Sequence, residues 1–388
     1  MLLLLCELLQ TLFGWKIPAV FAYFSTRMLL AATTSLLFCI FLGPVFIRKL
    51  YAWKIGQPLR SLEECPMLAQ LHGKKKDTPT MGGILILFSM LLSLFLWMDL
   101  SNTFTLIFLF TTLVLGSLGA IDDYLKLRYK NSKGLSPRKK LICQLLLASL
   151  LGITLLCPTV TNTLPHPPTA KQHNTRLTTQ QYTTQFYVPF FKDPLCTLSP
   201  IIAFSLILFV ITGTSNAVNL TDGLDGLASG CLVMVSVVLG LVAFLSNNID
   251  LSRYLNILYI EGSGEIAVYL FALSGACLGF LWYNGYPAQI FMGDTGSLAL
   301  GGIIGTSAIL LRRELLLALC GAIFVAEALS VIIQVVSYRT RNKRRVFLCA
   351  PLHHHFEYKG WPETKVVLRF WIVSLLFAIF SVASLKFQ

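Results

Sequence analysis

Five carboxylates that stand where long apolar segments end are the side chains of this chain best suited to chemistry. Asp122 and Asp123 close one apolar segment, Asp222 and Asp225 lie in the motif NLTDGLDG, and Asp294 lies in FMGDTGS. Only 18 of the 388 residues are acidic, and a carboxylate at membrane depth is costly to keep without a function. If the fold brings these groups together, we expect them to hold a metal ion or to act on phosphate.

The first pair begins the motif DDYLK. Adjacent residues on a helix point about 100° apart, so Asp122 and Asp123 need not serve one ligand. We expect one of them to face a metal ion or a phosphate and the other to orient Lys126, which is itself a candidate phosphate ligand. The structural alternative for the two acids is that they are solvated at a helix end. The alternative for Lys126 is that it is one of the many cations of a cytoplasmic loop.

The motif FMGDTGS resembles the start of a helix, with Asp294 or Thr295 as the N-cap. An acid in a tight turn flanked by glycines is also a good oxygen ligand for Mg²⁺, which prefers one or two carboxylates together with substrate phosphates. Phe291, three residues earlier, is a candidate for stacking on a base, although a lone aromatic residue near a membrane interface is more often an anchor.

In NLTDGLDG, Asp222 and Asp225 are three residues apart and share one face if the turn is helical. An N-cap at Asp222 or Thr221 is the structural alternative. Capping explains one acid but not two acids together with Asn216 and Asn219, so a ligand site is favoured.

Two further motifs point to an anionic substrate. APLHHHFE places His353, His354 and His355 in a row; consecutive side chains diverge, so donation to phosphate fits better than a shared metal ion. The basic run RTRNKRR precedes it. GKKKDTPTMGG offers the cation of Lys75 with the hydroxyl of Thr80 and backbone amides. An excess of cations in cytoplasmic loops is the alternative for both basic runs.

The elements that must position these groups are membrane helices. The chain is 55% hydrophobic and only 13% charged, whereas a soluble domain carries roughly 25% charged residues. Apolar runs of the length needed to cross a bilayer recur throughout. An all-α polytopic membrane protein is therefore expected. We predict about ten spans, near 26–47, 81–99, 104–121, 140–157, 199–214, 227–246, 266–283, 297–311, 315–338 and 367–386; the spans at 199–214 and 297–311 are short enough to extend into the motifs beside them.

The charge distribution predicts the orientation of these spans. Of the 31 Lys and Arg residues, seven lie at 48–80, seven at 122–140 and eight at 339–369. This places the loops that follow the first, third, fifth, seventh and ninth spans in the cytoplasm, and both termini outside. Two spans separate each motif from the next, so all the motifs are expected on the cytoplasmic face. The net charge of +13 is explained by the same bias, and we expect no nucleic-acid partner.

The whole chain, 1–388, is expected to be one integral membrane domain. Residues 1–25 are interpreted as an interfacial or partial helix rather than a cleaved signal. The polar segment 158–198 is expected to pack loosely outside the membrane, with a short hairpin near QFYVPFF. Cys157 and Cys196 bracket this segment, and a disulfide between them stays open at this point.

Taken together, the motifs TPTMGG, DDYLK, SNAVNLTDGLDGLA, FMGDTGSLALG and APLHHHFE resemble the bacterial phospho-N-acetylmuramoyl-pentapeptide transferase family, within the polyprenyl-phosphate N-acetylhexosamine-1-phosphate transferase superfamily. They occur in the family's order and cover most of residues 70–360. TPTMGG and PLHHHFE point to the muramoyl-peptide branch rather than to the N-acetylglucosamine branch.

The resemblance implies a ten-span enzyme of the bacterial inner membrane with a cytoplasmic active site. It would transfer phospho-MurNAc-pentapeptide from UDP-MurNAc-pentapeptide to undecaprenyl phosphate, giving lipid I and UMP, with Mg²⁺ as cofactor and the bilayer as partner; a homodimer stays open. By similarity, the catalytic residues are Asp122, Asp123, Asp294 and His353, with Asp294 as the metal ligand. Positions that match the family's nucleotide pocket are Lys75, Thr80, Asn219, Asp222, Asp225, Asn284, Phe291, Gly293 and Gln334.

Direct attack by the lipid phosphate, with Asp122 as base, is favoured over a phospho-enzyme, because a phosphate monoester is already largely ionised near neutral pH. Two other functions are weighed against this one. A transporter with an ion relay requires carboxylates near the bilayer midplane. In this sequence only one carboxylate, that of Glu327, lies clearly within a predicted span. A sister transferase would use UDP-N-acetylglucosamine instead.

Overall fold

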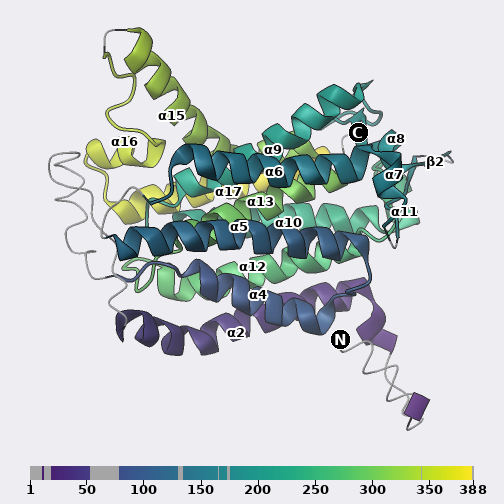
Figure 1. Ribbon diagram of the computed structural model, residues 1–388, viewed down its shortest axis with the longest axis horizontal. Coiled ribbons are helices and arrows are strands. Elements are labelled where there is room, and N and C mark those ends of the chain that lie inside the picture. Colours follow the sequence, from purple (N-terminus) through teal and green to yellow (C-terminus); the bar gives the residue numbers. More distant parts are fainter. Residues whose placement is uncertain are drawn as a thin grey trace.

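The computed structural model describes residues 11–12, 19–52, 78–129, 134–164, 166–172, 175–341 and 343–386. Long helices run side by side along one axis and form most of the molecule (Figure 1). They are α2 (Phe24–Ala52), α4 (Gly83–Trp97), α5 (Thr103–Arg128), α6 (Pro137–Leu156), α9 (Pro200–Thr221), α10 (Leu227–Ser246), α12 (Gly264–Asn284), α13 (Gly293–Leu311), α15 (Ala322–Thr340) and α17 (Glu363–Ser384).

Within the described ranges, nine of these helices are long and apolar enough to cross a membrane, and α4 is a shorter apolar helix of 15 residues. Nine of the ten predicted spans each coincide with one helix, which confirms the all-α membrane class. As anticipated, α9 and α13 extend into their neighbouring motifs. The prediction of a single helix at 315–338 is wrong, because the chain breaks at Gly321 into α14 (Glu314–Cys320) and α15.

The centre of the bundle is α13, whose residues from Thr295 to Leu311 are all buried. Its sequence SLALGGIIGTSA is rich in small residues, so neighbouring helices approach closely, as is usual inside membranes. A β-carbon on Gly301 would lie 2.7 Å from the carbonyl oxygen of Thr214 in α9, and one on Gly302 would clash with Leu115 in α5. Close packing of α5, α9 and α13 therefore fixes where their ends, and the motifs on them, lie.

One end of the bundle, here called the loop end, carries the short elements (Figure 1). These are η1 (Ala19–Ala22), α7 (Pro158–Thr161), α8 (Thr179–Thr183), α11 (Ile249–Tyr254) and the strands β1 (Ala170–Gln172), β2 (Thr175–Leu177), β3 (Gln185–Phe186), β4 (Cys196–Thr197) and β5 (Tyr259–Ile260). Both sheets are antiparallel, with strand orders β2-β1-β5 and β3-β4. The start of α2 and the end of α17 also lie here, because Arg27 pairs with Glu265 at the start of α12 and Phe190 packs on Phe380.

The polar segment 158–198 does not pack loosely, contrary to the prediction. Tyr182 and Tyr187 are buried, and Arg312, which is fully buried at the end of α13, donates from Nε and Nη2 to the Gln185 carbonyl oxygen at 3.0 and 2.7 Å. The β3-β4 pair is the short hairpin expected near QFYVPFF. Cys157 and Cys196 are both free thiols. Of the expected amino-terminal segment 1–25, residues 1–10 and 13–18 lie outside the described residues.

Candidate active site

A cluster of acids and lysines lies at the end of the bundle opposite the loop end. The α5 helix runs toward it from the loop end, where Thr103 Oγ1 donates to the His166 carbonyl. At its far end, the carboxylate of Asp122 meets the ammonium groups of Lys126 at 2.7 Å and Lys140 at 2.8 Å. The Oδ2 atom of Asp294 lies 2.5 Å from Lys140 Nζ and 3.2 Å from Lys126 Nζ. Two lysines thus bridge carboxylates that are 172 positions apart in the chain.

Asp123 lies at the edge of this bridge, with Oδ1 4.0 Å from Lys126 Nζ, and caps α13. Its carboxylate accepts hydrogen bonds from the backbone N–H of Asp294 (3.1 Å) and Thr295 (2.9 Å) and from the Thr295 hydroxyl (2.7 Å). The expectation that Asp294 or Thr295 is the N-cap is therefore wrong: Met292 holds the cap position, and the capping carboxylate comes from α5. Because Asp123 caps the helix, the carboxylate of Asp294 can form ion pairs with Lys126 and Lys140.

Glycines let these motifs touch. Gly293 has a φ of +73°, a conformation that only glycine adopts readily, and a β-carbon there would lie 2.7 Å from Asp123 Oδ2 and 2.9 Å from the Thr80 hydroxyl. A side chain on Gly119 would overlap the backbone of Asp294. The two helix ends are thus in backbone contact at the cluster.

The donor set fits a divalent cation. One carboxylate oxygen each of Asp122, Asp123 and Asp294 lies within 4.8 Å of the other two, and the first two residues are buried. Hard oxygen donors at this spacing suit Mg²⁺. The bridging ammonium groups of Lys126 and Lys140 offset the same negative charge.

The NLTDGLDG motif contributes to this cluster through one of its acids. Asn219, on α9, donates from Nδ2 to Asp294 Oδ1 at 3.0 Å and to Ser297 Oγ at 2.8 Å. Asp222 follows the helix as its C-cap. Burial raises the pKa of Asp222 to about 7, and the nearby charges of Asp294 and Asp123 add to the effect. Asp222 therefore belongs electrostatically to the acid cluster.

Asp225 turns elsewhere, because the helical turn that a face shared with Asp222 would require is not formed. Residues 222–226 form a turn rather than a helix. Asp225 accepts from the backbone N–H of Ala288 at 3.0 Å, and Asn284 accepts from the Gly226 N–H at 3.1 Å while donating to the Ile290 carbonyl. These two side chains fix the α12–α13 loop, and through it the position of Phe291 and Gly293.

The TPTMGG motif pairs with that loop. The N–H of Phe291 donates to the Pro79 carbonyl, and the N–H groups of Gly82 and Gly83 donate to the carbonyls of Phe291 and Met292, all at 2.7–2.8 Å. Thr80 is consequently held beside the cluster, as expected. Lys75 lies outside the described residues.

The histidine motif reaches the same region from α16 (Leu352–Tyr358). Glu327 on α15 accepts from the backbone N–H groups of Leu352 (2.6 Å) and His353 (3.2 Å), and lies 3.2 Å from His353 Nδ1. The buried His353 ring then presses its Nε2 edge against Gly223, next to Asp222. Among the described residues, this Nε2 atom has no hydrogen-bond partner.

The remaining residues of this motif lie in separate contacts. His354 Nδ1 is 2.7 Å from Glu357, whereas His355 Nδ1 accepts from the Leu348 N–H at 3.1 Å. The His353 and His354 rings are in edge contact, with centroids 4.2 Å apart, while the Nδ1 atoms of the three histidines face different partners. Gln334 accepts from the N–H groups of 346 and 347 and donates to the carbonyl of 347, so its amide positions the chain that leads into α16.

Three residues of this site escaped the sequence reasoning. Lys140 was counted only among the cations of a cytoplasmic loop, and Thr295 only as a cap. Glu327 was noted as an acid within a span, and its partner was unknown. A buried acid within a span usually has a polar or charged partner, and this rule could have linked Glu327 to the histidines. No sequence pattern distinguishes Lys140 from the neighbouring cations.

Comparison with known proteins gives consistent findings. Residues 105–312 match the model of glycosyl transferase family 4, and residues 75–87 match signature 1 of phospho-N-acetylmuramoyl-pentapeptide-transferase. These matches include DDYLK, NLTDGLDG, FMGDTGS and TPTMGG, the motifs that build the cluster.

Curated relatives agree over the full length. The chain is 60% identical to the phospho-N-acetylmuramoyl-pentapeptide-transferase of Protochlamydia amoebophila, with all of both chains covered. It is 46% identical to the protein of the same name from Desulfotalea psychrophila and 45% identical to that from Thermodesulfovibrio yellowstonii, with 95% of each chain covered in both cases.

Proposed function

The chain belongs to the phospho-N-acetylmuramoyl-pentapeptide-transferase family, and from this premise we propose that the cluster of Asp122, Asp123 and Asp294 with Lys126 and Lys140 is its catalytic centre. The protein transfers phospho-MurNAc-pentapeptide to undecaprenyl phosphate and forms lipid I. The donor is UDP-MurNAc-pentapeptide and the leaving product is UMP. The convergence of three carboxylates and two ammonium groups from α5, α6 and α13 is the observation that carries the assignment.

The reaction brings two anions together. An oxygen of the undecaprenyl phosphate forms a bond to the sugar-bearing phosphorus of the donor, and the bond from that phosphorus to the bridging oxygen breaks, so that the electron pair leaves with UMP. Cations must offset the repulsion between the two phosphates. Lys126 and Lys140 supply two fixed positive charges, and the amino end of α13 adds its partial positive charge.

Mg²⁺ is the proposed cofactor, with Asp294 as its ligand and Asp122 beside it. When bound, it would neutralise phosphate charge and stabilise the leaving UMP. Asp123 holds the backbone of Asp294 and Thr295 in place, so its role is positioning. Lys126 and Lys140 hold the carboxylates of Asp122 and Asp294 together through their ion pairs.

Asp122 is the proposed base for direct attack. Its carboxylate is buried and lies 2.7 Å from the ammonium of Lys126 and 2.8 Å from that of Lys140. The lipid phosphate is already largely ionised at neutral pH, so little proton transfer is required. A phospho-enzyme on one of the acids is the competing mechanism.

The nucleotide side of the site is proposed to consist of Lys75, Thr80, Asn219, Asp222, Asp225, Asn284, Phe291, Gly293 and Gln334. His353, aimed past Gly223 toward Asp222 and fixed by Glu327, is proposed to donate from Nε2 to a phosphate oxygen. His354 and His355 complete this proposed anion-binding edge.

The enzyme is proposed to lie in the bacterial inner membrane with the cluster facing the cytoplasm, because most Lys and Arg residues lie on the loops of that end. The proposal extends to a homodimer, since α2, α15 and α17 present exposed apolar faces to lipid or to a second copy. Light scattering of the purified protein in detergent tests the dimer.

The function is tested with purified protein, undecaprenyl phosphate and Mg²⁺. UMP release with UDP-MurNAc-pentapeptide, with none from UDP-N-acetylglucosamine and none after chelation of the metal, is the expected result. Release from neither nucleotide sugar would sink the transferase assignment, and release only from the N-acetylglucosamine donor would point to the sister branch.

A further inference from the structure

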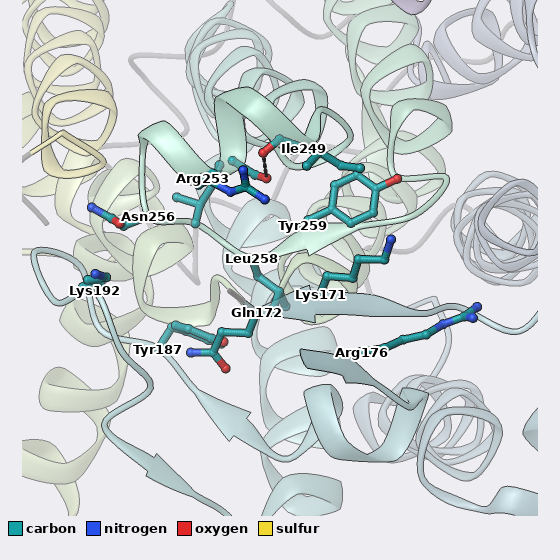
Figure 2. A pocket seen from close by; sticks show the side chains of 12 residues that line it. Lys171, Gln172, Arg176, Tyr187, Lys192, Ile249, Arg253, Asn256, Leu258 and Tyr259 are labelled. Atoms are coloured by element: carbon teal, nitrogen blue, oxygen red, sulfur yellow. Dashed lines mark hydrogen bonds between the residues drawn. The ribbon is translucent and has the colours of Figure 1, made fainter. Parts of the chain in front are cut away.

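A hollow of about 330 Å³ lies at the loop end, and Figure 2 shows the side chains that line it. Four cationic side chains line it: Lys171, Arg176, Lys192 and Arg253. No acidic residue is among the twelve described residues that form its lining. A hollow with this lining has the chemistry of an anion-binding site.

The walls come from two distant parts of the chain. Lys171 lies on β1 and Arg176 on β2, whereas Arg253 lies on α11 and Tyr259 on β5. The pairing of β1 with β5 sets Lys171 directly opposite Tyr259, with the ammonium 5.7 Å from the ring centroid. The hollow is therefore built by tertiary pairing and is not a single run of basic residues.

The floor is tied to the bundle. Tyr187 and Leu258 are buried within it, and the guanidinium of Arg313 packs 5.2 Å from the Tyr187 ring centroid. The buried Arg312 holds the neighbouring Gln185 carbonyl. Such a preformed floor lowers the entropic cost of binding a ligand.

The four cations are not neutralised by the protein itself. Within the described part of the chain, none of them has an ion-pair partner within 4.0 Å. The nearby acids Asp193, Asp250 and Glu261 stand outside the lining. Cations that line one hollow repel one another, and an anion relieves that repulsion. The two arginines in particular suit phosphate, to which guanidinium groups donate in pairs.

The position of the hollow relative to the membrane helices indicates where a bound phosphate would come from. Its α11 and β5 walls connect α10, which ends at Ser246, to α12, which begins at Gly264, so the hollow sits just beyond two membrane helices. The chain neighbours of Lys192 and Arg253 are exposed aromatic residues: Phe191 is 58% and Tyr254 66% exposed. Cations beside exposed aromatic residues just past the helix ends are typical of the head-group layer.

We propose that this hollow binds the phosphate head group of an anionic phospholipid from the leaflet at the loop end. The acyl chains would lie along the exposed faces of the adjoining helices, and the head group would contact the four cations. Such a lipid would also tie segment 158–198 to the α11–β5 segment, because each contributes part of the lining.

The test is thermal unfolding of the full chain in detergent, after removal of native lipid, with three probes. These are short-chain phosphatidylglycerol, short-chain phosphatidylcholine and inorganic phosphate. Phosphatidylglycerol should raise the melting temperature saturably, and the other two should have little effect at the same concentration. An equal effect of inorganic phosphate would contradict the lipid assignment in favour of a free anion, and an equal effect of phosphatidylcholine would contradict an anionic head group.

Variants locate the effect. Lys171→Gln with Arg253→Gln should raise the half-saturating phosphatidylglycerol concentration about tenfold or more. Arg48→Gln with Lys49→Gln is the matched control, because it removes the same two charges from exposed positions at the other end of the bundle. Should the first pair unfold the protein, Arg176→Gln with Lys192→Gln, both exposed, takes its place. An unchanged half-saturating concentration in a folded pocket variant would overturn the proposal.

Discussion

At the scale of single residues, the two adjacent acids of DDYLK have different tasks. Asp122 faces two lysines, whereas Asp123 accepts three hydrogen bonds from the start of α13. The divergence follows from helix geometry and was expected; which acid takes which task depends on the packing of α5 on α13, which the sequence does not reveal. The same holds for Lys140, one of seven cations at 122–140 and, with Lys126, one of the two that reach Asp294.

Asp123→Ala is expected to destabilise the protein by about 1–3 kcal/mol, because it leaves two N–H groups and a hydroxyl without their acceptor. Asp123→Asn keeps one acceptor oxygen and should recover part of the loss. Thermal unfolding in detergent measures both. An Asp123→Ala variant with the same melting temperature as the wild type would refute the capping role.

Asp222 should make stability depend on pH in the absence of divalent metal. Its folded-state pKa of about 7 exceeds the ordinary value of 3.8, so the folded protein binds this proton more tightly than the unfolded chain does. The contribution of Asp222 to stability therefore falls as pH rises between these values and reaches its full penalty above pH 7. Asp222→Asn should stabilise the protein at pH 8, on the order of 1 kcal/mol after solvent screening, with little change near pH 4. Melting curves with chelator present would reject this if the variant lost stability at pH 8.

At the scale of elements, the helix ends explain why the motifs meet. The apolar lengths and the number of spans between motifs were enough to predict ten helices and one shared face. They did not reveal the break at Gly321, because LLLALCGAIF reads as a continuous apolar run. They also did not reveal that segment 158–198 is well packed. Its polar composition is typical of a loose loop, but the buried Arg312 and Tyr182 anchor it.

Gly293→Ala tests the contact between α5 and α13. The new β-carbon would meet Asp123 Oδ2 at 2.7 Å and the residue would keep a positive φ. We expect transferase activity to fall by at least about 100-fold, since a displacement of about 1 Å at a reacting centre has that effect. Gly360→Ala is the matched control: its φ is +83°, but the β-carbon meets nothing within 4 Å. Equal activity in the two variants would mean that backbone strain, and not the contact with Asp123, governs the result.

At the scale of the whole molecule, the acid cluster and the hollow occupy opposite ends of one bundle. The carboxyl-terminal end of α17 lies at the loop end, where Lys386 packs over Tyr254. If the cluster faces the cytoplasm, as proposed, that end lies outside.

Fusion of alkaline phosphatase after the last residue should consequently give active phosphatase, because this enzyme requires an oxidising compartment. The same enzyme inserted at Asn342, in the basic loop before α16, should be inactive. The reverse pattern would place the cluster outside the cell and remove access to a cytoplasmic nucleotide sugar.

The central claim is that Asp294 holds the metal on which transfer depends. The most direct measurement is UMP release from UDP-MurNAc-pentapeptide and undecaprenyl phosphate across a Mg²⁺ titration, for the wild type, Asp294→Asn and Asp250→Asn. Asp250 is an exposed acid at the loop end and serves as the control. We predict that Asp250→Asn follows the wild type, whereas Asp294→Asn loses turnover by at least about 1,000-fold at every Mg²⁺ concentration with an unchanged melting temperature, corresponding to about 4 kcal/mol of transition-state stabilisation. Turnover by folded Asp294→Asn within a few-fold of the wild type, with the same Mg²⁺ dependence, would contradict the account.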